Sequence, residues 1–106
     1  MSALPEILEL ARAFRTQLES RLHAPVEVVL IGSHARGEAE ETSDIDLIAF
    51  VPELDRSTWR LLLDTAWEIG FKAGKVLSVI PVAAAEKDVL AASPLLQVAQ
   101  VEGISV

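Results

Sequence analysis

The first pattern along the chain is an apolar stripe at helical spacing near the N-terminus. Its members recur at every third or fourth position and fall on one face of an α-helix; they are Leu4, Ile7, Leu8, Ala11, Phe14, Leu18 and Leu22. Pro5 suits the first turn of a helix, and the Ala24-Pro25 step ends the pattern. The sequence therefore predicts an amphipathic helix over residues 4–23.

Three short apolar runs rich in β-branched residues predict strands. They cover residues 26–31, 45–51 and 76–82, and each is bounded by glycine, proline or polar residues. Pro81 lies near the end of the third run. Because proline has no N–H to donate to a ladder, we expect that strand at an edge of the sheet.

A second helical stripe lies between the second and third predicted strands. It consists of Trp59, Leu62, Leu63, Ala66, Trp67 and Gly70. Asp55 or Ser57 is the candidate N-cap, and the segment from Gly70 to Gly74 is the expected end. We interpret the two tryptophans as core or partner-interface residues rather than as stacking partners for a base.

The remaining segments predict two short helices, at residues 83–90 and 94–101, followed by Gly103 and an apolar tail. The resulting order is helix, strand, loop, strand, helix, strand, helix, helix. This order favours an α/β or α+β domain in which helices cover a small sheet. Residues 33–43 are polar and are expected to form a loop with a brief helical turn at 33–36.

Candidate chemistry lies where the second predicted strand begins. Asp44 and Asp46 are two residues apart, so in a strand both carboxylates project from the same face. Two negative charges at such a short separation repel each other unless cations lie between them. Mg²⁺ prefers oxygen ligands and is usually completed by substrate phosphates. A pair of such ions stabilises the attacking and leaving oxygens of phosphoryl or nucleotidyl transfer.

A glycine turn precedes these carboxylates, separated from them by a spacer of ten residues. Gly32 lets the backbone approach a ligand, while Ser33 and the following amides can donate hydrogen bonds to phosphate oxygens. Arg36 is a weaker candidate for the same anion. A Gly-Ser turn alone is usually only a turn, and an Asp-x-Asp pair is often a solvated strand end. The order in which they occur together favours a triphosphate site.

Composition narrows the possible partners and location. The 106 residues, 51% of them hydrophobic, fit one domain over residues 1–106. A formal net charge of −7 disfavours nucleic acid as a partner. There is no cysteine, residues 1–9 lack the pattern of a secretory leader, and no apolar run is long enough for a membrane span. We therefore expect a soluble, cytoplasmic protein. A mean hydropathy of +0.37 suggests that a partner or a second copy covers apolar surface.

The motif resembles that of the minimal nucleotidyltransferases of the DNA polymerase beta superfamily. The resemblance rests on Gly32-Ser33, on Ala35-Arg36-Gly37 within the spacer, and on Ser43 ahead of Asp44-x-Asp46. The ending, with Ser93-Pro94-Leu95-Leu96 and Glu102-Gly103-Ile104, is similar to that of small stand-alone members.

The resemblance implies a mixed sheet flanked by helices, with Asp44 and Asp46 as catalytic metal ligands and Gly32, Ser33 and Arg36 at the nucleotide. It further implies ATP or another nucleoside triphosphate with Mg²⁺, and transfer of a nucleoside monophosphate to a hydroxyl. The small members resemble antitoxins that pair with a helical HEPN toxin and modify one of its tyrosines, so a HEPN-type partner or a homo-oligomer is expected.

One departure from the family pattern concerns a third carboxylate on the next strand. That strand reads Lys75-Val76-Leu77-Ser78-Val79-Ile80, and the matching position is Leu77 or Ser78. Neither can act as a carboxylate base. Asp64 and Glu68 lie on the preceding helix and are not expected to turn inward. Two hypotheses therefore stay open: a metal-dependent nucleotidyltransferase, and a catalytically impaired module that acts by covering a HEPN-type toxin. His34, within the motif, is expected to be an exposed loop residue.

Overall fold

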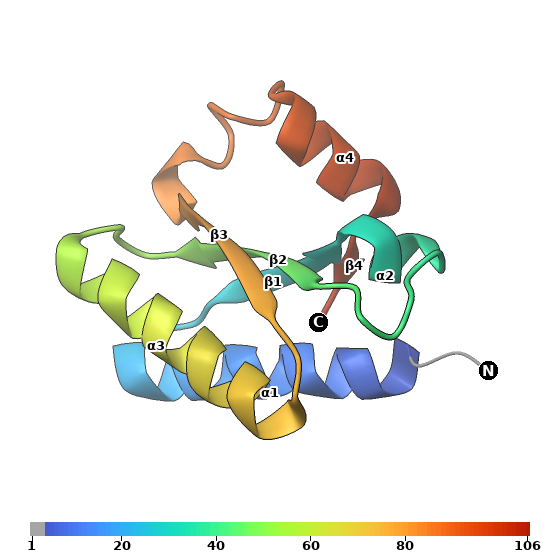
Figure 1. Ribbon diagram of the computed structural model, residues 1–106. Helices are drawn as coiled ribbons and strands as arrows, with labels where there is room; N and C mark the ends of the chain where they lie inside the picture. The colour runs from blue at the N-terminus through green and yellow to red at the C-terminus, as the bar shows by residue number, and fades with distance from the viewer. Residues whose placement is uncertain (1–3) are drawn as a thin grey trace.

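A four-stranded mixed sheet lies between two layers of helices in the computed structural model, which describes residues 4–106 (Figure 1). The strand order is β3-β2-β1-β4. β1 runs antiparallel to both β2 and β4, whereas β2 and β3 are parallel and are joined through α3. The elements are α1 (Leu4–Leu22), β1 (Glu27–Ile31), α2 (Gly32–Arg36), β2 (Ile45–Val51), α3 (Arg56–Ala73), β3 (Leu77–Ala83), a 3-10 turn (Ala84–Glu86), α4 (Pro94–Glu102) and β4 (Ile104–Ser105).

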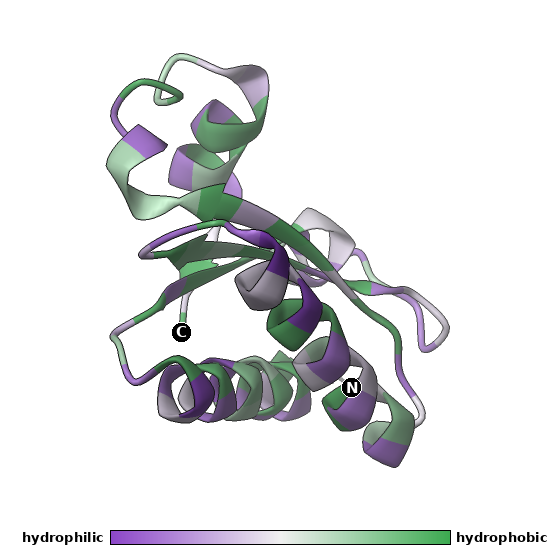
Figure 2. Ribbon diagram, turned by 90° about the vertical axis from the view of Figure 1, so that its left-hand side faces the viewer, coloured by the Kyte–Doolittle hydropathy of each residue, from purple (hydrophilic) through white to green (hydrophobic). Residues whose placement is uncertain are grey.

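The larger part of the core lies between the sheet and the α1–α3 layer. Alternate residues of β1 and β2 point to this side, because successive side chains of a strand face opposite ways. They pack against the stripe of α1 and the inner side of α3, and the residues with no exposed surface include Phe14, Leu18, Val28, Leu30, Ile45 and Leu47. Figure 2 shows strands coloured hydrophobic along much of their length above helices of mixed hydropathy.

The opposite face of the sheet carries a smaller core under α4. Its buried members are Val29, Ile31, Ile48, Phe50, Val82 and Leu96. α4 begins at Ser93, whose hydroxyl accepts a hydrogen bond from the backbone N–H of Leu96 at 3.3 Å, with Pro94 in the first turn. Ile80, which pairs with Ile48 and so lies on this face, remains 36% exposed, so α4 covers only part of the face.

α3 begins and ends where its local sequence predicts. The Asp55 carboxylate accepts a hydrogen bond from the backbone N–H of Thr58 at 2.8 Å, which caps the N-terminus. Gly74 adopts φ 67° at the C-terminus, a conformation that favours glycine. Arg21 at the end of α1 joins the two helices, because its guanidinium donates to Thr65 at 2.8 Å and pairs with Glu68 at 2.5 Å.

The expected fold class is confirmed, as are four helical segments and three strands, with boundaries that differ by a residue or two. β3 lies at an edge of the sheet, as Pro81 predicts. Two expectations for the C-terminal third differ from the structure. Residues 83–90 form a 3-10 turn and further turns instead of a helix, because Val89 and Leu90 are 79% and 37% exposed and so have no core to pack against. The apolar tail after Gly103 forms β4, a fourth strand that pairs with β1.

None of the helices within residues 4–106 combines the length and the apolarity that a bilayer crossing requires. The expectation about a leader falls partly on residues 1–3, which lie outside the described residues.

Candidate functional site

The glycine turn and the second aspartate of the motif meet at one end of the β1–β2 pair. Gly32 opens α2 directly after β1, and the antiparallel register places Ile31 opposite Asp46. Gly32 adopts φ 78°, and a Cβ atom added there would lie 2.5 Å from Oδ2 of Asp46. This position favours glycine, because a side chain would be strained by the positive φ and would displace the Asp46 carboxylate.

Asp44 and Ser33 complete the edge of this site. Asp44 is exposed and immediately precedes β2, while Asp46 is partly buried as the second residue of that strand. Ser33 is partly buried in the first turn of α2, and no side chain caps the start of that helix. The backbone N–H groups of this turn and the two carboxylates therefore border the same open end of the sheet.

His34 is buried, and the expectation of an exposed loop residue is wrong. Its side chain is 7% exposed, and Nε2 donates a hydrogen bond to the backbone carbonyl of Ser43 at 3.1 Å. Ser43 in turn accepts a hydrogen bond on its hydroxyl from the backbone N–H of Glu40 at 2.9 Å. His34 thus ties α2 to the residue before Asp44. A helical turn of five residues is too short for periodicity to indicate which of its faces is buried.

Burial and a neighbouring charge act together on Asp46. Desolvation raises its pKa above the ordinary value of 3.8, and the negative charge of Asp44 raises it further, while His34 and Arg36 oppose the shift. Ionisation of Asp46 is therefore disfavoured as it stands, and a cation between the two carboxylates would offset both causes.

Arg36 is already engaged by two carboxylates. Its Nε lies 3.1 Å from Glu38 and its Nη1 lies 3.4 Å from Glu102 at the end of α4. The hydrogen bond with Glu38 is the main cause that raises the pKa of Arg36, so the side chain stays cationic. An anion at Gly32 and Ser33 would have to compete with Glu38 and Glu102 for this guanidinium.

The parallel register of β2 and β3 identifies the position where a third carboxylate is absent. Asp46 pairs with Ser78, which is exposed, whereas Leu77 pairs with Ile45 and packs against the core. Glu68 of α3 pairs with Arg21 on the far side of the sheet. Across residues 4–106, no three His, Cys, Asp or Glu residues gather closely enough to hold a metal ion.

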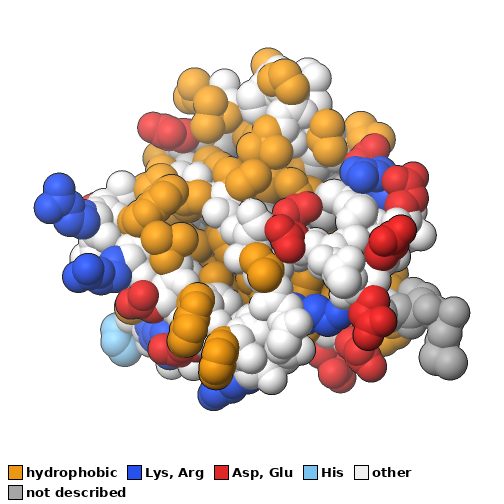
Figure 3. Space-filling model, viewed as in Figure 1, with side chains coloured by type: hydrophobic (Ala, Val, Ile, Leu, Met, Phe, Trp, Pro, Cys, Tyr) orange, Lys and Arg blue, Asp and Glu red, His pale blue; other side chains and the backbone are white. Residues whose placement is uncertain are grey.

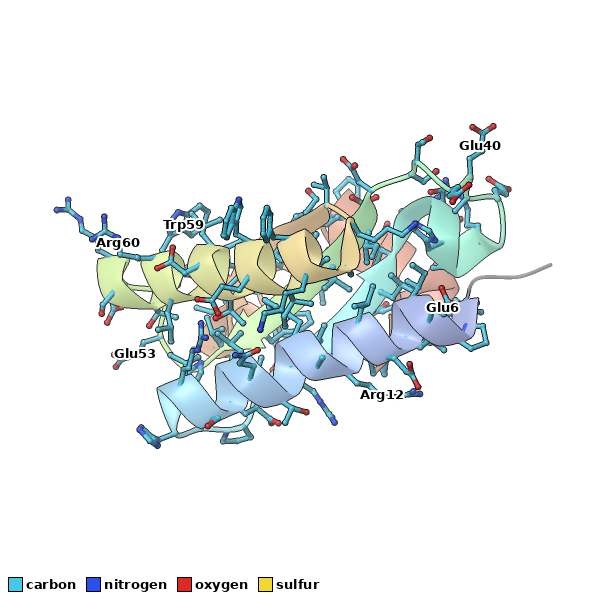
Figure 4. The ribbon with its side chains drawn as sticks, turned by 60° about the horizontal axis from the view of Figure 1, so that its bottom comes forward. Glu6, Arg12, Glu40, Glu53, Trp59 and Arg60 are labelled. Carbon is cyan, nitrogen blue, oxygen red and sulfur yellow. The ribbon has the colours of Figure 1, made fainter. Side chains whose placement is uncertain are left out.

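Two carboxylates side by side fit a hard divalent cation that takes its other ligands from water and from phosphate oxygens. The donor set of Asp44 and Asp46 is of this kind, and the near contact of Gly32 with Asp46 leaves backbone beside the carboxylate instead of a side chain. The donor types present are therefore those that a cation with a phosphate ligand would use. Figure 4 shows Glu40 pointing outward from the loop that leads to this site.

The two tryptophans of α3 lie outside the core. Of the two roles expected for them, core packing and a partner interface, core packing is wrong. Trp59 is 45% exposed and Trp67 is 66% exposed. Their period is helical, but it marks the outer face of α3, and Leu62, Ala66 and Ile69 form the buried face. The role as an interface stays a prediction.

Comparisons with known proteins identify the family of the chain. A family model described as a nucleotidyltransferase domain matches residues 11–93. A protein of Methanocaldococcus jannaschii whose assigned name is protein adenylyltransferase is 36% identical over 50 residues, which are 46% of this chain and 50% of the relative. The chain thus matches about half the length of this curated relative.

Solved structures of similar fold come from two settings. One is a toxin–antitoxin crystallised with AMP-PNP, with a TM-score of 0.55 and 20% identity. The superposition covers 97% of this chain and 71% of the chain in that structure. A protein of Sulfolobus solfataricus described as a nucleotidyltransferase covers 96% of this chain and 80% of its own, with a TM-score of 0.55 and 21% identity. A mutant of the MntA-HpeT toxin–antitoxin covers 96% and 70%, with a TM-score of 0.54 and 18% identity. At these identities the likeness establishes the fold.

Proposed function

The chain belongs to the nucleotidyltransferase domain family, and from this we propose that it binds a nucleoside triphosphate with Mg²⁺ at the Gly32–Asp46 site. In this proposal Gly32 and Ser33 contact the triphosphate, and Asp44 and Asp46 hold the cation. The observation that carries it is the near contact of the Gly32 backbone with the Asp46 carboxylate. A glycine at this position keeps any side chain from displacing the Asp46 carboxylate and leaves only backbone beside it.

The proposed reaction transfers a nucleoside monophosphate to a hydroxyl of a partner protein. The hydroxyl oxygen forms a bond to the α-phosphorus, the bond from that phosphorus to the bridging oxygen of the β-phosphate breaks, and pyrophosphate leaves. When bound, Mg²⁺ stabilises the charge on the phosphate oxygens. Gly32 and Ser33 orient the triphosphate through backbone and hydroxyl donors. The name of the Methanocaldococcus jannaschii relative supports a protein as the acceptor.

β3 carries no carboxylate that could accept the proton of the acceptor hydroxyl. Ser78 occupies the position next to Asp46, and a neutral serine hydroxyl is a poor proton acceptor at neutral pH. In this proposal the proton passes to water, to a phosphate oxygen of the nucleotide or to a base that the acceptor protein supplies. Catalysis at this site consequently depends on the acceptor more than it would with a carboxylate at residue 78.

The presence of Ser78 where a third carboxylate would lie favours a second candidate function. A protein that keeps the nucleotide site but lacks the third carboxylate can act as a binding module, covering a HEPN-type toxin without modifying it. The likeness to toxin–antitoxin folds is compatible with this candidate and with the enzyme.

Calorimetry with ATP and Mg²⁺ tests the nucleotide site. We expect binding by the wild type and loss of at least about ten-fold in affinity for Asp44→Asn and for Asp46→Asn, because two carboxylates share the cation. Asp88→Asn is the matched control, since Asp88 is an exposed aspartate in the turn before α4. Equal affinities for wild type and both site variants would refute the proposed site.

Transfer of label from ATP carrying ³²P at the α-phosphate separates enzyme from binding module. The acceptor tested is the product of the neighbouring gene. Ser78→Asp supplies the absent carboxylate, and we expect it to raise any transfer at least about ten-fold, in line with general-base contributions. A stable complex with no label transferred by the wild type or by Ser78→Asp would favour the binding module.

A further inference from the structure

The outer face of α3 carries four large apolar side chains at a spacing of four residues. Trp59, Leu63, Trp67 and Phe71, here called the α3 stripe, are 45%, 48%, 66% and 72% exposed. Residues four apart on a helix lie one above another. Single exposed apolar residues are ordinary on a protein surface, but an aligned set that includes three aromatic rings marks an interaction site.

The α3 stripe borders a groove that ends at the open edge of the sheet. The groove has a volume of about 750 Å³, and its apolar walls are Leu63, Trp67 and Phe71 from α3 and Val76, Leu77 and Val79 from the β3 side. β3 is an edge strand of the sheet, and within residues 4–106 no strand covers its outer edge. In Figure 3, hydrophobic side chains gather over α3 and β3, with basic side chains on the left, where α3 begins in the view of Figure 1.

Two of the aromatic rings are arranged in advance for contact. Trp67 and Phe71 stack with ring centroids 4.9 Å apart and an interplanar angle of 12°. Each ring restricts the rotation of the other, so less side-chain entropy is lost when a partner packs on them. Figure 4 shows Trp59 and Arg60 on the outer side of the first turns of α3.

The charges around the α3 stripe contrast with the acidic character of the whole chain. Arg56 and Arg60 lie at the start of α3 and Lys72 lies in its last turn, and none of the three forms an ion pair within residues 4–106. Arg21, Arg36 and Lys87 elsewhere each pair with a carboxylate. In a chain of net charge −7, Arg56 and Arg60 line a second pocket that shares Leu63 and Asp64 with the groove, and Lys72 follows Phe71 on α3.

We propose that the α3 groove binds an amphipathic helix of another protein, with carboxylates flanking its apolar face. An apolar helix face at a spacing of three and four residues matches the walls of the groove. Carboxylates near the two ends of that helix would meet Arg56 and Arg60 in the adjoining pocket at the start of α3 and Lys72 in its last turn. Asp64, which also lines the groove, would meet a neutral or basic residue near the middle.

A second copy of this chain is a poor occupant of the groove for electrostatic reasons. An antiparallel pairing of two α3 stripes places Arg56 of one copy near Lys72 of the other. A parallel pairing places each Arg56 beside its counterpart. Both arrangements bring like charges together, which disfavours association.

The groove also adjoins the candidate nucleotide site. Lys75 lines the groove, and its Nζ donates a hydrogen bond to the backbone carbonyl of Glu41 at 2.9 Å, in the loop that leads to Asp44. A helix in the groove would contact Lys75, whose side chain holds the loop that leads to a proposed metal ligand. This link to transfer rests on the proposed function, whereas docking in the groove does not require nucleotide.

Intrinsic fluorescence provides a direct test, because the chain has two tryptophans and both belong to the α3 stripe. The probes are three synthetic peptides without aromatic residues: a helical peptide with a leucine face flanked by glutamates, the same peptide with lysines in place of the glutamates, and a scrambled version of the acidic peptide. We expect a blue shift of the tryptophan emission with the acidic peptide, with affinity at least about ten-fold higher than for the basic peptide. The scrambled peptide should give no shift.

Variants then locate the binding. Phe71→Ser leaves both tryptophans in place and should weaken binding of the acidic peptide at least about ten-fold. Val89→Ser is the matched control, because Val89 is 79% exposed and lies in the turns before α4, so its affinity should equal that of the wild type. Because Phe71 is 72% exposed, its substitution should leave the fold intact, which circular dichroism checks. The pair Arg60→Glu and Lys72→Glu should reverse the preference in favour of the basic peptide.

Three results would overturn the proposal: equal affinity for the acidic and basic peptides, no emission shift with either, or self-association of the chain that Phe71→Ser abolishes in sedimentation. Calorimetry with ATP and Mg²⁺ on Phe71→Ser separates this proposal from the nucleotide site. Peptide binding without nucleotide binding by the wild type would refute the proposed function alone. Nucleotide binding without peptide binding would refute the groove alone.

Discussion

The two faces of the β-sheet differ in how completely the helices cover them. On the α1–α3 side, the core residues of β1 and β2, such as Leu30 and Leu47, have no exposed surface. On the α4 side, Ile31 and Phe50 remain 6% and 5% exposed, and the sheet is open where Asp46 meets Gly32. We therefore expect the covered face to supply most of the stability, whereas the open face carries the candidate chemistry.

β2 joins the two faces within one strand. Ile45 and Leu47 point to the covered side, whereas Asp46 and Ile48 point to the open side. The buried residues on either side of Asp46 hold its backbone rigidly, because a strand residue cannot move without its neighbours. A partly covered face beside a fully covered one therefore lets a rigid scaffold present an accessible carboxylate.

The largest expected effect is the difference between matched leucine truncations on the two faces. Leu47→Ala should lower the free energy of unfolding by about 4 kcal/mol and Leu96→Ala by about 2 kcal/mol, because the α4 side can relax toward solvent around the cavity. Urea unfolding followed by circular dichroism measures both. Equal losses would contradict the view that the covered face dominates stability.

Gly32→Ala should have the next largest effect, on the open face. Its positive φ costs about 1–2 kcal/mol for a residue with a side chain, and the new Cβ collides with the Asp46 carboxylate. We expect both a loss of stability and a loss of ATP–Mg²⁺ affinity of at least about ten-fold. Gly37→Ala is the control, since Gly37 has φ 72° but nothing within 4 Å of its added Cβ. Equal nucleotide affinities for Gly32→Ala and Gly37→Ala would place the site elsewhere.

Local sequence signals were sufficient for the covered side of the molecule. The stripe of α1, the Asp55 cap and the Gly74 end of α3 depend on neighbours within a few residues, and all three are confirmed. β4 could not be predicted in this way, because a strand of two residues exists only through its pairing with β1. The helix expected at 83–90 failed for the opposite reason, since helical propensity without a surface to pack on does not hold a helix.

For the open face, the sequence indicated which residues carry chemistry but not how they are held. The pairing of Asp46 with Ser78 requires the parallel register of β2 and β3, which no local pattern encodes. The burial of His34 likewise follows from packing of α2 against its surroundings. The period of Trp59 and Trp67 identified a helix face correctly, but not whether that face points inward.

His34→Ala tests the tie between α2 and the loop before Asp44. Loss of its hydrogen bond to Ser43 and of its buried volume should lower the free energy of unfolding by about 1–2 kcal/mol. Because Ser43 precedes Asp44, we also expect weaker ATP–Mg²⁺ binding. His34→Gln retains an N–H donor and should restore part of both. If His34→Ala weakens folding but leaves nucleotide affinity unchanged, the role of His34 is structural only.

Asp46→Asn should have the smallest effect on stability, and its sign separates a site residue from a structural one. Burial and the charge of Asp44 raise the pKa of Asp46 above 3.8 in the folded protein, so the native state binds more protons than the unfolded state just above that pH. Ionisation therefore costs stability as pH rises through this window, and Asn avoids that cost. At neutral pH we expect Asp46→Asn to be more stable than the wild type by a few tenths of a kcal/mol, since solvent screens a partly exposed carboxylate.

Asp55→Asn, at the N-cap of α3, should change the stability at neutral pH in the opposite direction to Asp46→Asn. The hydrogen bond from the backbone N–H of Thr58 lowers the pKa of Asp55 below 3.8, so its ionised form stabilises the fold above that value and loses this contribution as the pH falls through the lowered pKa. Asp55→Asn should therefore be less stable than the wild type at neutral pH and approach it in acid, while the advantage of Asp46→Asn disappears in acid. Thermal unfolding from pH 3 to pH 7 measures both. A loss of stability for Asp46→Asn at neutral pH would mean that the ionised carboxylate supports the fold. It would contradict the view that ionised Asp46 destabilises the fold until a cation binds.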